Sequence, residues 1–343
     1  MSAFKPLMSQ PRVLFDVALR LVQGQRFQPT GFPDLGAATY RLPDGKQMLL
    51  VESPQSMANR LEATAWDGVA NDLVAPLRGL PYIAAFSPPP DSRFLTSSIL
   101  EAHRLNSPYF LDSAGGTFMQ LLKKELEEGQ GEESEAVNLR HAAKVMFKYD
   151  PNSVLHGVFL ANKKLAGGRY RFARLLSAFI EAEDVLPVES GGVKNDRLNP
   201  SGDTGAGYGN VPFHRTEFVA SSITAHFSLD LATLRGYGLG EDEENLLIGL
   251  ALWKIRRLLE GNLRLRTACD LTCDVNQVFA SAPQGFVLPT AEELDSKMPA
   301  LIERCAEAFA QPRVTKLVWS SREAKKLASD RKKRETEDEE AQQ

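Results

Sequence analysis

A short segment near the start of the chain combines residue types that can hold an anion. Residues 48–51 are apolar and predict a strand, Ser53 can cap a following helix, and Pro54 suits its first turn. Successive helical residues turn by about 100°, so one helix face collects three neutral hydrogen-bonding side chains and a guanidinium, namely Gln55, Ser56, Asn59 and Arg60. Helix-start amides, the helix dipole and arginine all favour phosphate.

The only acid expected near this helix face is Glu62, at its edge. An ordinary solvent-exposed helix face is the alternative interpretation.

Two other segments add candidate nucleic-acid contacts. Arg26 lies in a loop rich in proline and glycine (26–36), where it could pair with an exposed nucleotide, and His103 and Arg104 lie on a helix predicted over 97–105. The alternative for His103 and Arg104 is that they are simply neighbours on a helix surface and bind no ligand.

A glycine-rich segment, 188–213, is predicted to be a long loop, and loops of that length are usually functional or disordered. Gly205, Gly207 and Gly209 do not form a dinucleotide fingerprint, because Pro212 and a strand pattern follow where a helix is required. We expect a mobile projection with polar contacts and one stacking ring, although plain disorder is the alternative. Its candidate contacts, with two from the start of the next strand, are Lys194, Asn195, Arg197, Tyr208, His214 and Arg215.

Composition restricts the function classes. The 343 residues carry a formal net charge of -4, so any nucleic-acid contact must come from a local groove. The chain has no apolar signal core and no run long enough to span a bilayer, which predicts a cytoplasmic protein. Cys269, Cys273 and Cys305 have no partners at zinc spacing, so we expect no metal site and no cofactor.

Hydrophobic periodicity and turn residues predict the elements that position these residues. The predicted strands are 13–22, 37–42, 47–51, 154–160, 170–185, 215–229, 263–271 and 314–319. The predicted helices are 54–66, 97–105, 118–128, 243–260 and 291–310. The segment 170–185 also fits a helix, 67–150 is expected to be a mainly helical insertion, and 129–135 a solvated loop. The cations Lys254, Arg256 and Arg257 are interpreted as compensating a helix dipole.

Without insertions, the order of elements is strand, helix, strand, strand, helix, strand. This is the ferredoxin-like order of an α+β fold, and the open face of such a sheet can accept single-stranded nucleic acid. Many unrelated proteins share this order, so it does not decide the function.

Six strings of this sequence, residues 27–38, 51–62, 98–109, 191–196, 210–217 and 263–270, resemble the Cas7 (RAMP-superfamily) backbone subunit of CRISPR Cascade complexes. The resemblance runs from about residue 10 to 320 and is greatest to subtype I-G, formerly I-U. It implies an RRM-like palm with a helical fingers insertion and a protruding thumb. The expected boundaries are palm 1–66, fingers 67–150, palm 151–187, thumb loop 188–213, palm 214–320 and a charged, disordered tail 321–343.

The resemblance also implies a function. Copies would polymerise head to tail along a CRISPR RNA without catalysis, holding its backbone and presenting its bases to a target DNA strand. Implied partners are the other Cascade subunits, including the large subunit and the guide-processing, end-capping subunit, and a recruited helicase-nuclease. The alternative is a metal-dependent RNA endonuclease, because related subunits of other CRISPR types cleave RNA with a loop aspartate. Asp34 and Asp67 are the candidates, and neither has a second acid or histidine convincingly spaced beside it.

Overall fold

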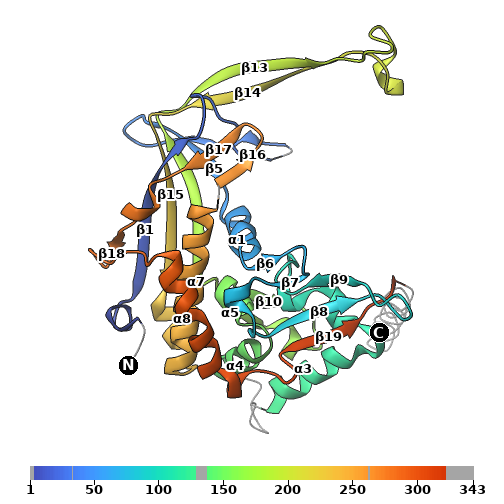
Figure 1. Ribbon diagram of the computed structural model, residues 1–343, viewed down its shortest axis with the longest axis vertical. Helices are drawn as coiled ribbons and strands as arrows, with labels where there is room; N and C mark the ends of the chain where they lie inside the picture. The colour runs from blue at the N-terminus through green and yellow to red at the C-terminus, as the bar shows by residue number, and fades with distance from the viewer. Residues whose placement is uncertain (1–3, 33, 129–136, 262, 322–343) are drawn as a thin grey trace, which may run out of the picture.

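The computed structural model describes residues 4–32, 34–128, 137–261 and 263–321. Its centre is an eight-stranded antiparallel sheet with the path β16-β17-β1-β15-β12-β5-β4, and β18 also pairs with β1 (Figure 1). The strands are β1 (Arg12–Leu21), β4 (Thr39–Arg41), β5 (Gln47–Glu52), β12 (Leu176–Glu183), β15 (Ser222–Asp230), β16 (Leu263–Arg266), β17 (Cys269–Thr272) and β18 (Ala280–Ala282).

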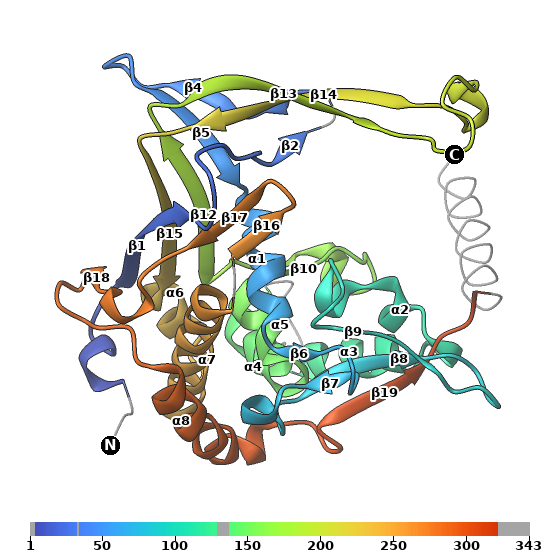
Figure 2. The ribbon, with the colours of Figure 1, turned by 45° about the horizontal axis from the view of Figure 1, so that its top comes forward.

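One face of this sheet is buried because buried and partly exposed side chains alternate along the central strands. In β12, for example, Leu176, Ala178, Ile180 and Ala182 are buried, while the residues between them are half-exposed. Helices α7 and α8 lie alongside β1 and β15 in both ribbon views (Figures 1 and 2). The helices of this part of the molecule are α1 (Pro54–Ala63), α6 (Leu231–Gly236), α7 (Glu241–Glu260) and α8 (Ala291–Arg304).

Besides helices, the insertion 67–150 contributes two strands to a second, smaller sheet. Its order is β19-β8-β9, and β19 pairs parallel to β8. The strands β8 (Tyr82–Phe86) and β9 (Phe94–Ser97) lie inside the insertion, whereas β19 (Val314–Val318) comes from the far end of the described chain. Helices follow only in the second half of the insertion: α2 (Pro108–Leu111), α3 (Thr117–Glu128) and α4 (Leu139–Tyr149).

The glycine-rich segment is part of a projecting two-stranded ribbon, so the loop predicted over 188–213 is confined to the connection 195–210. Strands β13 (Leu186–Lys194) and β14 (Val211–Val219) pair antiparallel along their whole length and project away from the central sheet (Figures 1 and 2). Gly191 permits this pairing, because a Cβ atom there would lie 2.8 Å from the Phe213 carbonyl oxygen. The strand predicted over 215–229 is therefore two strands, β14 and β15.

Four other elements differ from their predictions. No α-helix covers 97–105, where a short 3-10 turn, Arg104–Asn106, follows β9. The segment 154–160 contains the end of α5 (Pro151–His156), which Asp150 caps, and then β10 (Val158–Leu160), which pairs with β11 (Tyr170–Phe172). The predicted strand 263–271 is the hairpin β16–β17, and helix α8 ends before residue 310.

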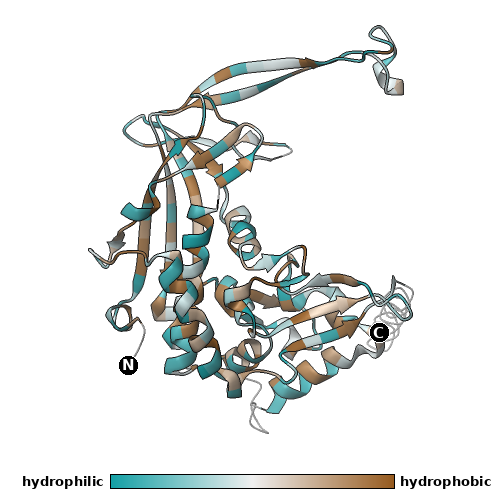
Figure 3. Cartoon of the chain, in the orientation of Figure 1, coloured by the Kyte–Doolittle hydropathy of each residue, from teal (hydrophilic) through white to brown (hydrophobic). Residues whose placement is uncertain are grey.

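Elements with strong local signals are confirmed, including β1, β4, β5, α1, α3, α7 and β19. The segment 170–185, which also fitted a helix, contains two strands, β11 and β12. The predicted loop 129–135 and the tail from 322 onward lie outside the described residues. Figure 3 shows apolar residues recurring along the central strands and β8. Within the described ranges, no helix is both long enough and apolar enough to cross a membrane.

Candidate functional site

Helix α1 is held by the contacts that its sequence predicts. The Ser53 side chain accepts a hydrogen bond from the Ser56 backbone N–H at 3.3 Å, and Pro54 occupies the first turn. Met57, Ala58 and Leu61 are buried. On the opposite face Gln55 and Asn59 are exposed, and the Gln55 amide donates to the Asn59 side chain at 3.0 Å. This face therefore offers neutral amide groups to solvent.

The other two members of that face are bound to an acid that the sequence analysis missed. Glu52, at the end of β5, is 1% exposed and accepts hydrogen bonds from the Ser56 hydroxyl and from Arg60 Nε, the latter at 3.2 Å. Arg60 also donates to the Leu265 carbonyl at 2.7 Å. Arg266, on β16, forms an ion pair with the same carboxylate. The expectation that Glu62 is the only nearby acid is wrong, and Arg60 joins α1 to β16.

Arg26 and Arg215, which are distant in sequence, meet at the base of the ribbon. Both face Glu217 of β14, which is 4% exposed: Arg215 lies 2.6 Å and Arg26 3.7 Å from its carboxylate oxygens. Backbone hydrogen bonds between Phe27 and Phe218 fix the 26–36 segment against this base. The side chain of Arg26 remains 55% exposed, so it presents a cation to solvent beside the base of the ribbon.

The remaining ribbon candidates lie in the far half of the ribbon, away from α1, and are all exposed: Lys194, Asn195, Arg197, Tyr208 and His214 (Figure 1). The connection 195–210 is organised by Asp196, whose carboxylate accepts hydrogen bonds from three backbone amides, those of residues 198, 199 and 209. These hydrogen bonds hold the pKa of Asp196 below its usual value. The ribbon tip therefore carries cations and one ring without any contact to the face of α1.

Arg104 is a buried structural cation, which corrects its place among the surface candidates. It is 6% exposed, and its Nε and one terminal nitrogen each donate to Glu62 at 2.7 Å. Its other terminal nitrogen donates to the Gly157 carbonyl at 3.0 Å. Glu62 is 4% exposed, so it faces the interior and not the edge of the anion-binding face. His103 is exposed beside this pair.

The same buried network contains Lys254, which corrects its interpretation as dipole compensation. Lys254 is fully buried, donates to the Asn152 side chain and lies 3.0 Å from His156 Nε2. Asn152 in turn donates to Glu62 at 2.8 Å. Burial lowers the pKa of Lys254 to about 8 and raises the pKa of the neighbouring Asp150 to about 6. The network joins α1, α5 and α7 through side-chain hydrogen bonds in the interior.

A groove beside this network contains residues that the sequence analysis missed. It has a volume of about 660 Å³ and lies between the turn at 102–106 and the hairpin β10–β11. We call it the basic groove, and its cationic or histidine side chains are His103, Arg104, His156, Arg171 and Arg174. A sequence signal was present, because residues 151–180 contain five lysines and arginines and no acid.

The open face of the central sheet is less suited to phosphate. Phe179 stacks on His226 with their ring centroids 4.8 Å apart, and Asp16 lies 2.7 Å from His226 Nδ1. Glu181 accepts a hydrogen bond from Tyr40 on the same part of the sheet. Carboxylates thus surround the only stacked pair that the described strands of this face provide, and they repel a nucleic-acid backbone.

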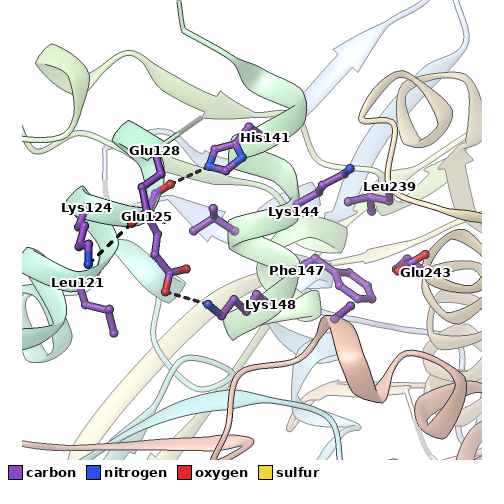
Figure 4. A pocket seen from close by; sticks show the side chains of 12 residues that line it. Leu121, Lys124, Glu125, Glu128, His141, Lys144, Phe147, Lys148, Leu239 and Glu243 are labelled. Carbon is purple, nitrogen blue, oxygen red and sulfur yellow. Dashed lines mark hydrogen bonds and ion pairs between the residues drawn. The ribbon is translucent and has the colours of Figure 1, made fainter. Parts of the chain in front are cut away.

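A second cavity, between α3 and α4, holds groups that are already paired (Figure 4). It has a volume of about 510 Å³, and Glu125 accepts hydrogen bonds there from Lys148 at 2.8 Å and from Tyr149 at 2.6 Å. The nuclease candidates are also isolated: Asp67 Oδ1 accepts from the backbone N–H groups of residues 69 and 70, and Asp34 is exposed. Among the residues placed by the structure, no cluster of three or more histidines, cysteines or acids could hold a metal ion.

Comparison with solved structures finds low-level likenesses to many chains, of which two are described here. A chain of a "CRISPR RNA-guided surveillance complex, pre-nicking" is 11% identical with a TM-score of 0.40, and the match covers 77% of this chain and 74% of that one. Csc2 of Thermofilum pendens is 12% identical with a TM-score of 0.31, and the match covers 90% of this chain and 80% of that one. TM-scores this low carry no argument about this chain.

Sequence comparison identifies the family. None of the curated proteins matches this chain. The model of the family "CRISPR-associated protein GSU0053", however, matches residues 13–187, which is just over half of the 343 residues and includes β1, α1 and β12. The chain therefore belongs to the CRISPR-associated protein GSU0053 family.

Proposed function

We propose that this chain is a non-catalytic backbone subunit of a type I Cascade complex, of subtype I-G, and that it binds CRISPR guide RNA. The observation that carries the proposal is the family match over 13–187, which includes the helix with the polar face. A subunit that holds any guide must bind phosphate and ribose and leave the base edges free for pairing with a target strand. The exposed amides of Gln55 and Asn59 can do this without a large positive charge.

The proposal assigns parts of the fold to a palm, fingers and thumb. Strands β17, β1, β15 and β12 are adjacent in that order and antiparallel, and with α1 and α7 they form the proposed ferredoxin-like palm. Residues 67–150, joined by β19, form the fingers. The thumb is the ribbon from 186 to 219 and replaces the shorter loop 188–213 expected from the sequence.

The ribbon also supports assembly between copies. Several large apolar side chains are exposed on it, among them Leu186 at 64%, Val193 at 55% and Phe213 at 52%. A lone two-stranded ribbon is marginally stable in water, so a partner surface that covers these side chains would stabilise it. We propose that a neighbouring copy provides this surface and that head-to-tail contacts extend along the guide. Other Cascade subunits would bind at the ends of the assembly, and a helicase-nuclease would be recruited to it.

Guide binding is tested first on the purified full-length chain. We expect co-purifying nucleic acid, detected as a raised ratio of absorbance at 260 nm to that at 280 nm that ribonuclease removes. The double variant Gln55→Ala, Asn59→Ala should then bind single-stranded RNA more weakly for every RNA sequence, as measured by filter binding. Arg60→Ala is less informative, because Arg60 holds Glu52 and the Leu265 carbonyl.

A matched control is the double variant Gln120→Ala, Lys124→Ala, which removes two exposed polar side chains from α3. It should bind RNA as the unmodified chain does. Equal RNA affinity of the α1 variant and the unmodified chain would show that α1 has only a structural role.

The nuclease alternative is tested by incubating the assembled complex with complementary RNA and Mg²⁺. Regularly spaced cuts that disappear on Asp34→Ala or Asp67→Ala would replace the non-catalytic assignment.

A further inference from the structure

We propose that the basic groove is a second contact site for single-stranded nucleic acid. In this site a backbone phosphate lies beside His103 and Arg171, and one base stacks on Phe159. The inference rests on the proposed function and extends it from the face of α1 to a surface formed by the hairpin β10–β11 and the turn at 102–106.

The hairpin provides a ready stacking platform. Phe159 and Arg171 are directly opposite each other in the antiparallel register, and the Arg171 guanidinium carbon lies 4.3 Å from the centre of the Phe159 ring. Phe159 is 43% exposed and Arg171 is exposed as well. An exposed aromatic ring with an adjacent guanidinium is the combination on which unpaired bases stack, while the cation faces the phosphate.

The charge around the groove is positive, unlike that of the chain as a whole. None of the twelve described residues that line it is an acid. The charge of Arg104 is neutralised by Glu62, which does not line the groove. His103, Arg171 and Arg174 are therefore the remaining basic side chains. The α3–α4 cavity of Figure 4, by contrast, contains Glu125, Glu128 and Glu243. The basic groove is thus the more favourable place for an anionic polymer.

His156, one of the residues lining the groove, carries an N–H donor that has no acceptor in the protein. Its Nε2 lies 3.0 Å from Lys254 Nζ, and an ammonium group can only donate, so Nε2 accepts and the ring proton lies on Nδ1. His156 is 1% exposed, and burial keeps its pKa well below the usual value, so the ring stays neutral. Nδ1 has no hydrogen-bond partner in the structure. An unpaired buried donor is costly, and a ligand oxygen would satisfy it.

The groove is also continuous with the face of α1. Arg174 donates to the Pro54 carbonyl at 2.9 Å and to the Gln55 side-chain oxygen at 2.8 Å, and it is also one of the residues that line the groove. A strand that crosses the exposed amides of α1 can therefore continue into the groove without crossing an acidic surface. The volume of about 660 Å³ falls in the range that accommodates a small ligand such as one nucleotide.

The test uses the full-length chain and two exposed substitutions, Phe159→Ala and Arg171→Gln. The probe is a fluorescein-labelled oligouridylate, and its affinity is measured by fluorescence anisotropy over a series of salt concentrations. Phe159→Ala should weaken binding by about five- to 100-fold through the lost stacking. Arg171→Gln should reduce the slope of log affinity against log salt by about 0.7, because one phosphate contact is lost.

The control is Arg93→Gln, which removes an arginine that is 74% exposed and paired with Asp91 on the turn between β8 and β9. It should leave both the affinity and the salt slope unchanged. Far-ultraviolet circular dichroism shows that each variant is folded. A 4-thiouridine probe should also photo-crosslink to a peptide that contains Phe159, as identified by mass spectrometry.

The experiment has two arms, which distinguish guide RNA from target DNA as the strand that occupies the groove. In the first, the chain alone binds the RNA probe; in the second, a preassembled chain–RNA complex binds complementary DNA. A defect in the first arm assigns the groove to the guide, and a defect only in the second assigns it to the target strand. If the unmodified chain binds in either arm and both variants match it throughout, this inference fails and the proposed function stands. If the unmodified chain binds no nucleic acid, both fail.

Discussion

At the scale of single residues, three buried glutamates determine which arginines are available to a ligand. Glu52, Glu62 and Glu217 are 1%, 4% and 4% exposed. Each pairs with at least one guanidinium group from a remote segment, namely Arg266, Arg104 and Arg26 respectively, and Glu52 and Glu217 also pair with the nearby Arg60 and Arg215. Four of the arginines that suggest phosphate contacts in the sequence, Arg26, Arg60, Arg104 and Arg215, therefore have carboxylate partners, whereas Arg197 and Arg171 are exposed.

The pair between Glu62 and Arg104 should be essential to stability. Glu62→Ala leaves a nearly buried guanidinium without its carboxylate, and we expect a loss of about 3–5 kcal/mol in the free energy of unfolding. Urea denaturation measures this loss. Glu189→Ala removes a carboxylate that is 67% exposed and should change the stability by less than about 0.5 kcal/mol. Equal stability of the two variants would contradict the structural role of the buried pair.

Asp150 should make stability depend on pH. Burial raises its pKa in the folded protein to about 6 from 3.8, so between these values the folded state holds a proton that the unfolded state has lost. This contribution to stability is present below pH 3.8 and is lost as the pH rises through about 6. Asp150→Asn keeps the helix cap but removes the titration. The stability of the unmodified chain relative to this variant should fall by about 3 kcal/mol over the interval.

The measurement is urea denaturation of both proteins at several pH values through this interval. Ser153, whose hydroxyl donates to Asp150, and Asn152, whose backbone N–H does so, remain in the variant. A stability difference that stays constant with pH would show that Asp150 does not titrate in this range.

At the scale of elements, the ribbon is structurally separate from the core. Its backbone contact with the 26–36 segment is the pair Phe27–Phe218 at its base, and its strands otherwise pair with each other. Replacing the connection 195–210 with an Asn-Gly turn should therefore change the free energy of unfolding by less than about 1 kcal/mol, since few buried contacts are lost. RNA-dependent oligomers should nevertheless disappear in size-exclusion chromatography. Unchanged oligomers would contradict the thumb assignment.

A single substitution tests the ribbon without shortening it. In Gly191→Val the new Cβ would lie 2.8 Å from the Phe213 carbonyl oxygen, so the strands must separate locally. We expect weaker RNA-dependent assembly with little change in the melting temperature of the body. The nearby Val193→Ala, on an exposed side of β13, is the milder comparison because it leaves the backbone pairing unchanged.

At the scale of the whole molecule, a chain with a net charge of -4 relies on local surfaces for an anionic partner. The proposed contacts involve the backbone and not base edges, so oligouridylate and oligocytidylate should bind with closely similar affinity at equal salt. Competition binding with unlabelled oligonucleotides measures this. A strong preference for one base would show that the chain reads base edges.

Local signals were sufficient for helices and strands whose determinants lie within a few residues. Ser53 and Pro54 define the start of α1, and the period-2 pattern of β15 predicts its buried face, because caps and periodicity depend only on neighbours along the chain. The order of the palm elements, the helix α7 and the exposed amides of α1 were predictable in the same way. The assignment to the family likewise came from sequence.

Long-range contacts decided the rest. β13 has no hydrophobic period that marks it as a strand, and only residues 215–219 of β14 were predicted to be in one, so only the pairing of the two segments reveals the ribbon. β19 joins β8 in parallel although some 230 residues separate them, and no local pattern encodes that pairing. The sequence around Arg104 and Arg171 does not distinguish the two side chains. In the structure, however, Arg104 is buried and ion-paired with Glu62, whereas Arg171 is exposed beside the Phe159 ring. Whether a charge is paired depends on which distant carboxylate the fold places beside it, and that information resides in the tertiary structure.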